Sequence, residues 1–347
     1  MMRKTRHQIK RAKTKKRVMK WILISISIIL FTIIGYGSYV YIKMTEVFER
    51  SNVEIEREGN KSGLREEDIS FGDDPISILL LGIEDYSTNG QNGRADTIII
   101  MTSDPNTNEI NMVTVPRDTR VNIENAAEFS GINKINSAYA LGSVTGYGDV
   151  KLQVETVEKL LDVPIDYYVA IDFNGFRDIV DALGGVTIDV KKAFWEENFY
   201  NNEKIQFEQG EQHLSGEEAL AFVRMRKRPA NASYSRDERQ RQFIKATIDQ
   251  ALSAGTLFKV GKISDILGEN IKTDLSVNEI FDLQKIFSKS EGLSIQSIEI
   301  KGEDRYVGRG SYFIPEEESL KEVSEKLRNI LNIETNRSFV TNADIVQ

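Results

Sequence analysis

The sequence contains no cysteine and only two histidines, His7 and His213. The absence of cysteine excludes disulfides, cysteine nucleophiles and thiolate metal sites. A zinc site with several histidines is excluded too, because His7 lies in a basic N-terminal arm. A Ser-His-Asp triad would have to use His213. At most one histidine is therefore available to the folded domain.

Charge is distributed unevenly along the 347 residues, which carry a net charge of −8. Residues 1–20 hold ten Lys or Arg and no acid, so the remaining chain carries −8 − 10 = −18. Such an acidic body argues against broad nucleic-acid binding, which usually needs a basic face. We expect no nucleic-acid partner.

Residues 21–42 form an uncharged run of 22 residues. At roughly 1.5 Å per helical residue, this run crosses a hydrocarbon core of roughly 30 Å. The positive-inside rule keeps the basic arm, residues 1–20, in the cytoplasm and places the rest outside. A cleaved signal peptide is the alternative, but its apolar region is shorter, about 7–15 residues. We expect a single-pass protein of the cell membrane with its N-terminus in the cytoplasm.

A polar stretch at residues 43–74 is typical of a linker, the folded domain is expected at residues 75–334, and a flexible tail at 335–347. The apolar run at residues 76–83 predicts a strand buried on both faces. The turn Asp104-Pro105-Asn106 predicts a hairpin. Further strands are expected at residues 97–102, 110–115, 166–171, 186–190 and 294–300.

Helices are expected between several of these strands. Apolar spacing predicts helices at 150–161 and 320–330, and another is expected at 173–183 before Gly184-Gly185. Capping boxes at Ser215–Glu218 and Ser235–Glu238 predict two more helix starts. This irregular alternation predicts a three-layer α/β/α sandwich with a mixed central sheet.

Carboxylates follow the first predicted strand. Glu84 and Asp85 end it, and Arg94 and Asp96 come shortly afterwards. The carboxyl ends of strands are where α/β folds place their sites. Two or three oxygen ligands of this kind suit Mg²⁺, which proteins hold with one or two carboxylates plus substrate phosphates. The alternative is a solvated loop without a role.

Arginines gather in two further stretches. Arg117 and Asp118 follow the strand at 110–115, and seven cations lie in the stretch from Arg224 to Arg241. Arg236 and Gln240 are four residues apart at the start of a helix, whose N-terminus attracts anions. The guanidinium fork suits phosphate. A phosphate site is favoured over the alternatives, a basic solvated face or a patch for anionic polymer.

Several motifs in this order resemble the LytR-CpsA-Psr family. They run from about residue 76 to residue 245 and comprise LLLGIED, RADT, VPRDT, KINSAYALG, DYYVAIDFNGF, LSGEEALAFVRMR and SRDERQRQFI. The resemblance implies an Mg²⁺-dependent phosphotransferase with an apolar groove for a polyprenyl chain. Such an enzyme moves an anionic glycopolymer, such as teichoic acid or capsule, from undecaprenyl diphosphate to peptidoglycan through a phosphodiester.

The resemblance also implies roles for individual residues. Asp96 is implied as a metal and catalytic carboxylate, Glu84 falls on the family's second metal aspartate, and Arg117 is expected to be catalytic. The implied diphosphate contacts are Arg94, Arg117, Arg224, Arg226, Arg236 and Gln240. Two departures stand out: glutamate replaces aspartate at Glu84, next to Asp85, and residues 232–236 lack the Gly-Asp-x-Gly-Arg pattern.

Three points stay open at the level of sequence. The same residues would serve a diphosphate hydrolase that uses water as acceptor, and a non-catalytic envelope regulator is a third hypothesis. The resemblance offers Phe173 and Phe176 as walls of the apolar groove, although an ordinary core role is favoured for both.

Overall fold

The structure is a computed structural model, which describes residues 35–39, 41–42, 45, 53–57, 59, 61–85, 92–107, 109–251, 270–276, 278–280, 282–283, 286, 294–334 and 338–345. The chain divides into Met1–Glu46 and Val47–Gln347, and all that follows concerns the second unit. The basic arm and most of the predicted membrane span at 21–42 lie outside the described residues. Among those described, none belongs to a helix with the length and hydropathy to cross a bilayer.

A six-stranded mixed sheet forms the centre of the unit, in the order β11-β6-β1-β2-β3-β12. Strand β1 lies parallel to β6 and antiparallel to β2, while β3 lies antiparallel to β2 and parallel to β12. The predicted mixed sheet is confirmed. The strands are β1 (Ile76–Glu84), β2 (Arg94–Asp104), β3 (Glu109–Thr114), β6 (Tyr167–Asp172), β11 (Ile271–Thr273) and β12 (Ser294–Glu299).

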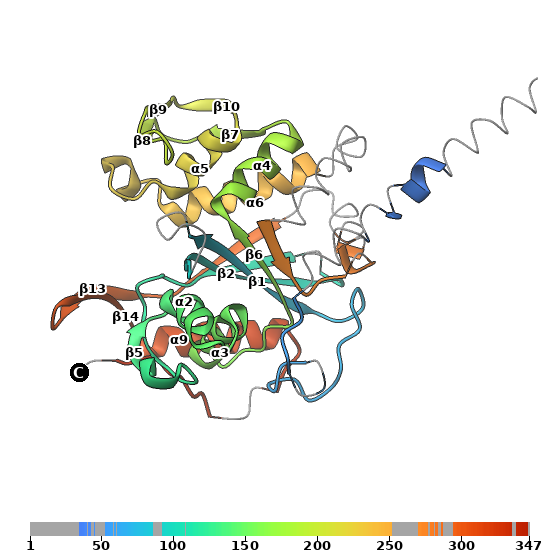
Figure 1. Ribbon diagram of the computed structural model, residues 1–347, viewed down its shortest axis with the longest axis vertical. Helices are drawn as coiled ribbons and strands as arrows, with labels where there is room; N and C mark the ends of the chain where they lie inside the picture. The colour runs from blue at the N-terminus through green and yellow to red at the C-terminus, as the bar shows by residue number, and fades with distance from the viewer. Residues whose placement is uncertain are drawn as a thin grey trace, which may run out of the picture. The chain divides into compact units, whose positions relative to one another are not determined.

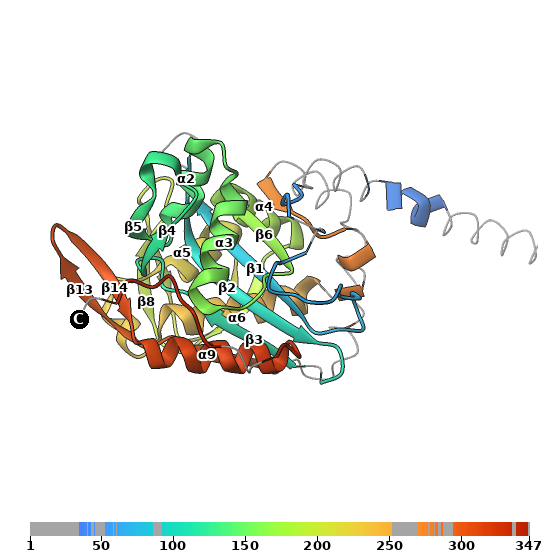
Figure 2. The same ribbon diagram turned by 90° about the horizontal axis from the view of Figure 1, so that it is seen from below.

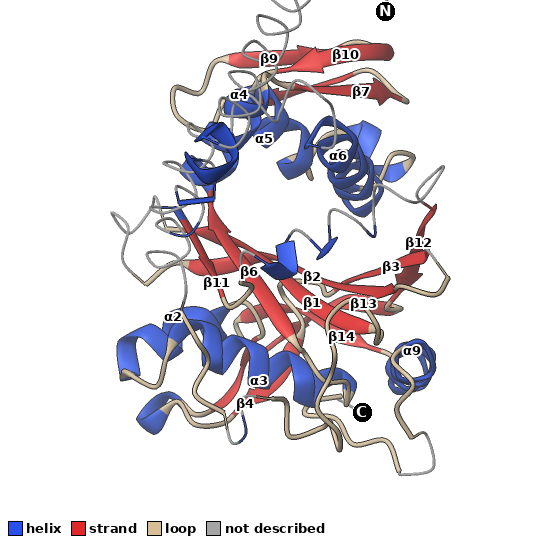
Figure 3. Ribbon diagram, turned by 90° about the vertical axis from the view of Figure 1, so that its right-hand side faces the viewer, coloured by secondary structure: helices blue, strands red, loops and turns tan. Residues whose placement is uncertain are grey.

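Helices cover both faces of this sheet (Figures 1 and 3). One face carries α2 (Ser137–Thr145), α3 (Asp149–Leu161) and α9 (Glu317–Ile330), which lie in front of the strands in Figure 2. The other face carries α4 (Phe173–Leu183), α5 (Gly216–Arg224) and α6 (Arg236–Ala251). The three-layer arrangement therefore matches the prediction.

Strand β1 contributes to both layers, because its side chains alternate between the two faces. Leu79, Leu81 and Ile83 pack into the large core formed with α3 and α9. Leu80 and Gly82 face the layer of α4, α5 and α6, where they line a cavity described below. The continuous apolar run is thus explained by two different neighbours on its two faces.

Helix ends follow the local sequence signals. Ser215 and Glu218 form the predicted capping box of α5, and α4 ends at Gly184, whose positive φ of 91° suits glycine. The Ser235 hydroxyl accepts a hydrogen bond of 3.2 Å from the Glu238 amide at the start of α6.

Four two-stranded sheets complete the unit, and most of their strands had no clear sequence signal. Only β7 was predicted at its observed position. The pairs are β4 (Arg120–Ile123) with β5 (Gly131–Lys134), β7 (Val186–Val190) with β10 (Gly210–Leu214), β8 (Phe194–Glu197) with β9 (Lys204–Phe207), and β13 (Gly302–Val307) with β14 (Gly310–Pro315).

Parts of the predicted linker and tail contact the domain. The Val53 amide donates to the Thr273 carbonyl over 3.1 Å, and Arg65 forms an ion pair of 2.6 Å with Asp166. Near the other end, Asp344 lies 2.6 Å from Arg120. The domain therefore includes described residues on both sides of the predicted range 75–334.

Candidate active site at the end of strand β1

Asp96 lies in a β-bulge where β1 ends and β2 begins. Gly82 pairs with Thr97 and Ile83 pairs with Ala95, which leaves Asp96 as the extra residue. Neighbouring residues of a regular strand point to opposite faces, yet Asp96 and Thr97 line the same cavity. The bulge thus re-aims one side chain, as bulges near active sites often do. A Cβ on Gly82 would lie 3.0 Å from the Thr97 Cβ, so the bulge also needs a small residue on β1.

Two side chains hold the Asp96 carboxylate in place. Arg117 Nη1 donates to Oδ2, and Asn136 Nδ2 donates to Oδ1 over 3.1 Å. A third group, Arg236 Nη2, donates to the Asp96 carbonyl over 2.7 Å. Asn136 is buried and belongs to the KINSAYALG motif, but no sequence signal pointed to a role for this residue. Asp96 is therefore held by residues from three separate parts of the chain, two at its carboxylate and one at its carbonyl.

A cavity of about 590 Å³ opens beside Asp96. We call it the arginine cavity, because its lining includes Asp96, Arg117, Arg224, Arg226, Arg228 and Arg236. The turn between β8 and β9 forms another wall through Asn198, Phe199 and Asn202. Guanidinium groups that are distant in sequence thus converge on one space, as the phosphate hypothesis requires.

The electrostatics of this cavity favour an anion. The buried Nε atoms of Arg117 and Arg228 have no hydrogen-bond acceptor among the described residues. Burial lowers the pKa of Arg224, while the Asp96 and Glu84 carboxylates act to raise it. An arginine keeps its charge under such a shift because its ordinary pKa lies far above neutral pH. Oxygen atoms of a phosphate would satisfy these donors.

Asp118 lies behind the cavity and links several of its cations. It lies 2.7 Å from the Lys134 ammonium and 3.6 Å from Arg226 Nη2. Burial would raise the pKa of Asp118, but Lys134, Arg117 and Arg226 more than offset burial and lower it. Asp118 therefore stays ionised and helps to hold Arg117 and Arg226 together.

An apolar cavity of about 220 Å³ adjoins the arginine cavity, between the sheet and helices α4, α5 and α6. Its lining includes Leu80, Gly82, Ile99, Phe176, Phe243 and Ile244. Thr97, Phe173, Val223 and Arg224 line both cavities. The two cavities therefore share part of their walls. Cationic groups line the arginine cavity, and aliphatic and aromatic groups line the apolar cavity. Phe173 and Phe176 both line the apolar cavity, although an ordinary core role was favoured from sequence.

Gln240 sits in the wall of the apolar cavity rather than the arginine cavity. Its Nε2 lies 3.5 Å from Thr97 Oγ1, and its buried Oε1 has no hydrogen-bond partner in the described part of the chain. Leaving a buried amide oxygen unsatisfied is costly.

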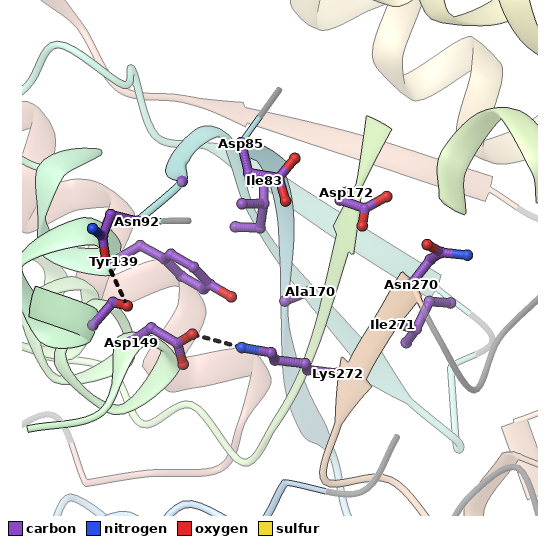
Figure 4. A pocket seen from close by; sticks show the side chains of 12 residues that line it. Ile83, Asp85, Asn92, Tyr139, Asp149, Ala170, Asp172, Asn270, Ile271 and Lys272 are labelled. Atoms are coloured by element: carbon purple, nitrogen blue, oxygen red, sulfur yellow. Dashed lines mark hydrogen bonds and ion pairs between the residues drawn. The ribbon is translucent and has the colours of Figure 1, made fainter. Parts of the chain in front are cut away.

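A third cavity, of about 520 Å³, lies on the other side of the end of β1 (Figure 4). We call it the acidic cavity, because Asp85, Asp149 and Asp172 line it together with Lys272, which lies 2.6 Å from Asp149. Burial raises the pKa of Asp85 and of Asp172, and the Asp85 charge raises that of Asp172 further. No arginine is among the residues that line it.

The arginine cavity and the acidic cavity help to decide whether Glu84 or Asp85 is the carboxylate that works with Asp96. Strand alternation puts Glu84 on the face of Gly82 and Leu80, and Asp85 lines the acidic cavity with Ile83. The Glu84 charge also acts on Arg224. Glu84 is therefore the better candidate to work with Asp96.

The predicted site residues separate into three groups. Asp96, Arg117, Arg224, Arg226 and Arg236 line the arginine cavity, and Gln240 lies at the junction. Arg94 is exposed and lies opposite Glu84 in the register of β1 and β2. It is not among the residues that line the arginine cavity. The roles of Arg94 and Glu84 stay predictions. Sequence reasoning missed the contributions of Asn136, Arg228 and the β8–β9 turn.

The loop that departs from the family pattern is held by a buried arginine. Arg239 Nε donates to the Phe222 carbonyl over 2.9 Å, and other nitrogens of Arg239 donate to the carbonyls of Met225 and Tyr234. Tyr234 is fully buried, and its hydroxyl donates to Gln242. These contacts fix the path from α5 to α6 on which Arg226, Arg228 and Arg236 lie.

A cationic cavity joined to an apolar one defines a protein built to bind an amphiphile with an anionic head group. Residues 38–329 match the LytR_cpsA_psr family, and the chain belongs to that family.

Relatives with assigned activities support this membership. The chain is 38% identical over 321 residues to the polyisoprenyl-teichoic acid–peptidoglycan teichoic acid transferase TagV of Bacillus subtilis, covering 91% of this chain and 80% of the relative. It is 37% identical over 323 residues to TagU of Halalkalibacterium halodurans, covering 91% of this chain and all of the relative.

Solved structures share the fold. The crystal structure of B. subtilis TagV superposes with a TM-score of 0.64 at 40% identity, covering 76% of this chain and 99% of TagV. The family protein YwtF (TagT) with bound octaprenyl pyrophosphate gives a TM-score of 0.63 at 29% identity, covering 81% of this chain and all of the other.

Proposed function

We propose that this protein is a phosphotransferase that moves an anionic glycopolymer from a polyprenyl diphosphate carrier to peptidoglycan. One observation carries the proposal: the arginine cavity and the apolar cavity share Thr97, Phe173, Val223 and Arg224. A diphosphate in the first cavity would lie next to its own polyprenyl chain in the second. Relatives at 37–38% identity carry the name of such a transferase, with teichoic acid as the polymer.

The proposed reaction exchanges one P–O bond for another. A hydroxyl of peptidoglycan attacks the phosphorus that carries the polymer, the bond to the bridging oxygen breaks, and polyprenyl phosphate leaves. Arg117, Arg224, Arg226 and Arg236 neutralise the charge that grows on the leaving phosphate. Asp96, whose carboxylate accepts hydrogen bonds from Asn136 and Arg117, would accept the proton of the hydroxyl.

Mg²⁺ is the expected cofactor, and Asp96 and Glu84 are the residues that would hold it. The described residues contain no group of three or more His, Asp or Glu that could form a complete metal site. Two carboxylates fit the habit of Mg²⁺, which completes its shell with waters and substrate phosphates. The ion would add positive charge beside the phosphates when bound.

The location follows from the sequence pattern at residues 1–42. We propose a single membrane span with the N-terminus in the cytoplasm and the catalytic unit outside, where peptidoglycan is found. Protease treatment of intact cells tests this topology. The large unit should be cleaved from outside, and full protection would reject the proposed place of the reaction.

Transfer itself is tested with the full-length protein in detergent micelles. Mixing lipid-linked polymer, peptidoglycan and Mg²⁺ should release polyprenyl phosphate and leave polymer bound to the wall. Asp96→Ala and Arg117→Ala should each lower this turnover by about 100-fold or more while the protein stays folded. Full activity in both variants rejects the site, and free polymer in place of wall-bound polymer would favour hydrolysis.

A further inference from the structure

Arg224 is held by aromatic rings rather than by acids. Its guanidinium carbon lies 4.1 Å from the ring centre of Phe199 and 4.9 Å from that of Phe173. Within the described part of the chain, the Arg224 side chain makes no hydrogen bond and no ion pair. Its N–H donors are therefore available to a ligand, and the rings decide where the guanidinium lies.

We call the contact of Arg224 with the rings of Phe199 and Phe173 the aromatic clamp. The position of Arg224 makes this clamp important. It is the last residue of α5 and lines both the arginine cavity and the apolar cavity. In a bound polyprenyl diphosphate, this junction is where the first phosphate meets the hydrocarbon chain. A guanidinium at that point contacts the group that leaves in the proposed reaction.

Phe199 belongs to a turn with a fixed shape. The Asn198 side chain is buried, its Oδ1 accepts from the Tyr200 amide over 2.8 Å, and its carbonyl accepts from the Asn202 amide over 2.9 Å. Asn202 has a φ of 60°, in the left-handed region that asparagine tolerates. This turn presents the Phe199 ring between two hydrogen-bonded asparagines.

The same turn is anchored to the helices that frame the apolar cavity. Asn198 Nδ2 donates to Glu217 of α5 over 2.6 Å, and the Tyr200 hydroxyl donates to Asn174 of α4 over 3.1 Å. The Phe199 ring also packs edge-on against Phe173, with 5.2 Å between ring centres. Phe199 is thus fixed relative to both α4 and α5.

We propose that Phe199 is a positioning residue that acts through Arg224. Its ring, with that of Phe173, restricts the guanidinium to one orientation at the junction of the two cavities. A cation over an aromatic face is attracted to it, and a restricted side chain loses less entropy when a phosphate binds. The proposal rests on the proposed function, because it takes a polyprenyl diphosphate as the ligand.

A double-mutant cycle separates this role from that of a passive wall. The probe is geranylgeranyl diphosphate, titrated into the full-length protein in detergent micelles. Phe199→Leu keeps an apolar side chain but removes the aromatic face, and it should weaken binding about tenfold. Phe199→Tyr should bind within about twofold of wild type. In an Arg224→Ala background, Phe199→Leu should cause less than about a twofold further loss.

A matched control removes an arginine–aromatic stack elsewhere. Arg120 lies 5.5 Å from the ring centre of Tyr312, so Tyr312→Leu should leave binding unchanged. Wild-type affinity in Phe199→Leu, or an equal loss in both backgrounds, would overturn the positioning role. No binding by the wild-type protein would reject the proposed function itself.

Folding is monitored by the unfolding temperature of each variant. If Phe199→Leu unfolds early, Phe199→Met and Phe199→Trp decide the question, because tryptophan gives the strongest cation–π contact. Tighter binding by the tryptophan variant supports the clamp, and equal binding by the two variants contradicts it.

Discussion

The two sides of strand β1 have different roles in the domain. On one side, Leu79, Leu81 and Ile83 are buried in the main core, and Asp85 follows in the acidic cavity. On the other side, Leu80 and Gly82 line the apolar cavity, and Glu84 follows on the same side, where its charge acts on Arg224. One strand of alternating side chains thus separates a packed layer from a binding layer.

An apolar run in the sequence therefore does not by itself indicate a solid core. Both sides of β1 are largely apolar, but only the side of Leu80 and Gly82 borders an apolar cavity in the described part of the chain. This cavity of about 220 Å³ lies between the sheet and helices α4 to α6. Variants on the two sides of β1 should therefore differ in what they damage.

The largest expected effect is on stability, from the packed side. Leu81→Ala removes a side chain that is 1% exposed, and it should lower the free energy of unfolding by about 2–5 kcal/mol. Leu80→Ala on the cavity side should cost about 1 kcal/mol, because that side chain is only partly enclosed. Urea unfolding of both variants measures the difference. Equal losses would mean that the two sides are packed alike.

The next effect is on catalysis, at the end of the strand. Glu84→Gln should lower Mg²⁺-dependent transfer about 100-fold, because an amide cannot supply the negative charge that a bound cation needs. Asp85→Asn, one residue further and in the acidic cavity, should change transfer less than about threefold. Turnover measured against Mg²⁺ concentration distinguishes the two, and a reversed order of effects would move the metal proposal to Asp85.

A smaller effect is expected from filling the apolar cavity. Ile179 lines it from α4, and Ile179→Trp adds bulk where the polyprenyl chain would lie. Affinity for a long-chain polyprenyl diphosphate should fall about tenfold, while affinity for inorganic pyrophosphate should stay the same. A titration with each ligand tests this, and equal losses for both would place the chain elsewhere.

The smallest effect is on the pH dependence of stability. The contribution of Asp118, near the arginine cavity, and that of Asp172, in the acidic cavity, should change with pH in opposite directions. The folded pKa of Asp118 is lowered, so its contribution is present above the ordinary value near 3.8 and is lost as pH falls through the folded pKa. The stability loss in Lys134→Met should therefore shrink on acidification.

The folded pKa of Asp172 is raised, so stability is lost as pH rises above 3.8. Asp172→Asn should gain stability at neutral pH, and that gain should vanish in acid; urea unfolding from acid to neutral pH checks both signs.

Much of the fold could be predicted because its signals are local. The apolar run of β1, the capping box at Ser215 and the glycine after α4 each act within a few residues of their own position. The arginine and carboxylate candidates were also visible, because they follow predicted strands or lie near predicted helix ends.

The parts of the fold and of the site that could not be predicted depend on contacts between segments that are distant in the sequence. The bulge at Asp96 exists only in the register of β2 against β1, which no local pattern in either strand reveals. The β8–β9 turn lacks a strong strand signal, so the place of Phe199 beside Arg224 could not be foreseen. Asn136 likewise acquires its contact with Asp96 only when α2 packs at the end of the sheet.

The most direct test of the account is a crystal structure of the protein with a bound polyprenyl diphosphate. Phosphate oxygens should contact Arg117, Arg224 and Arg236, and the hydrocarbon chain should lie between β1 and helices α4 to α6. Phosphates bound away from these arginines, or a chain that leaves the apolar cavity empty, would contradict it.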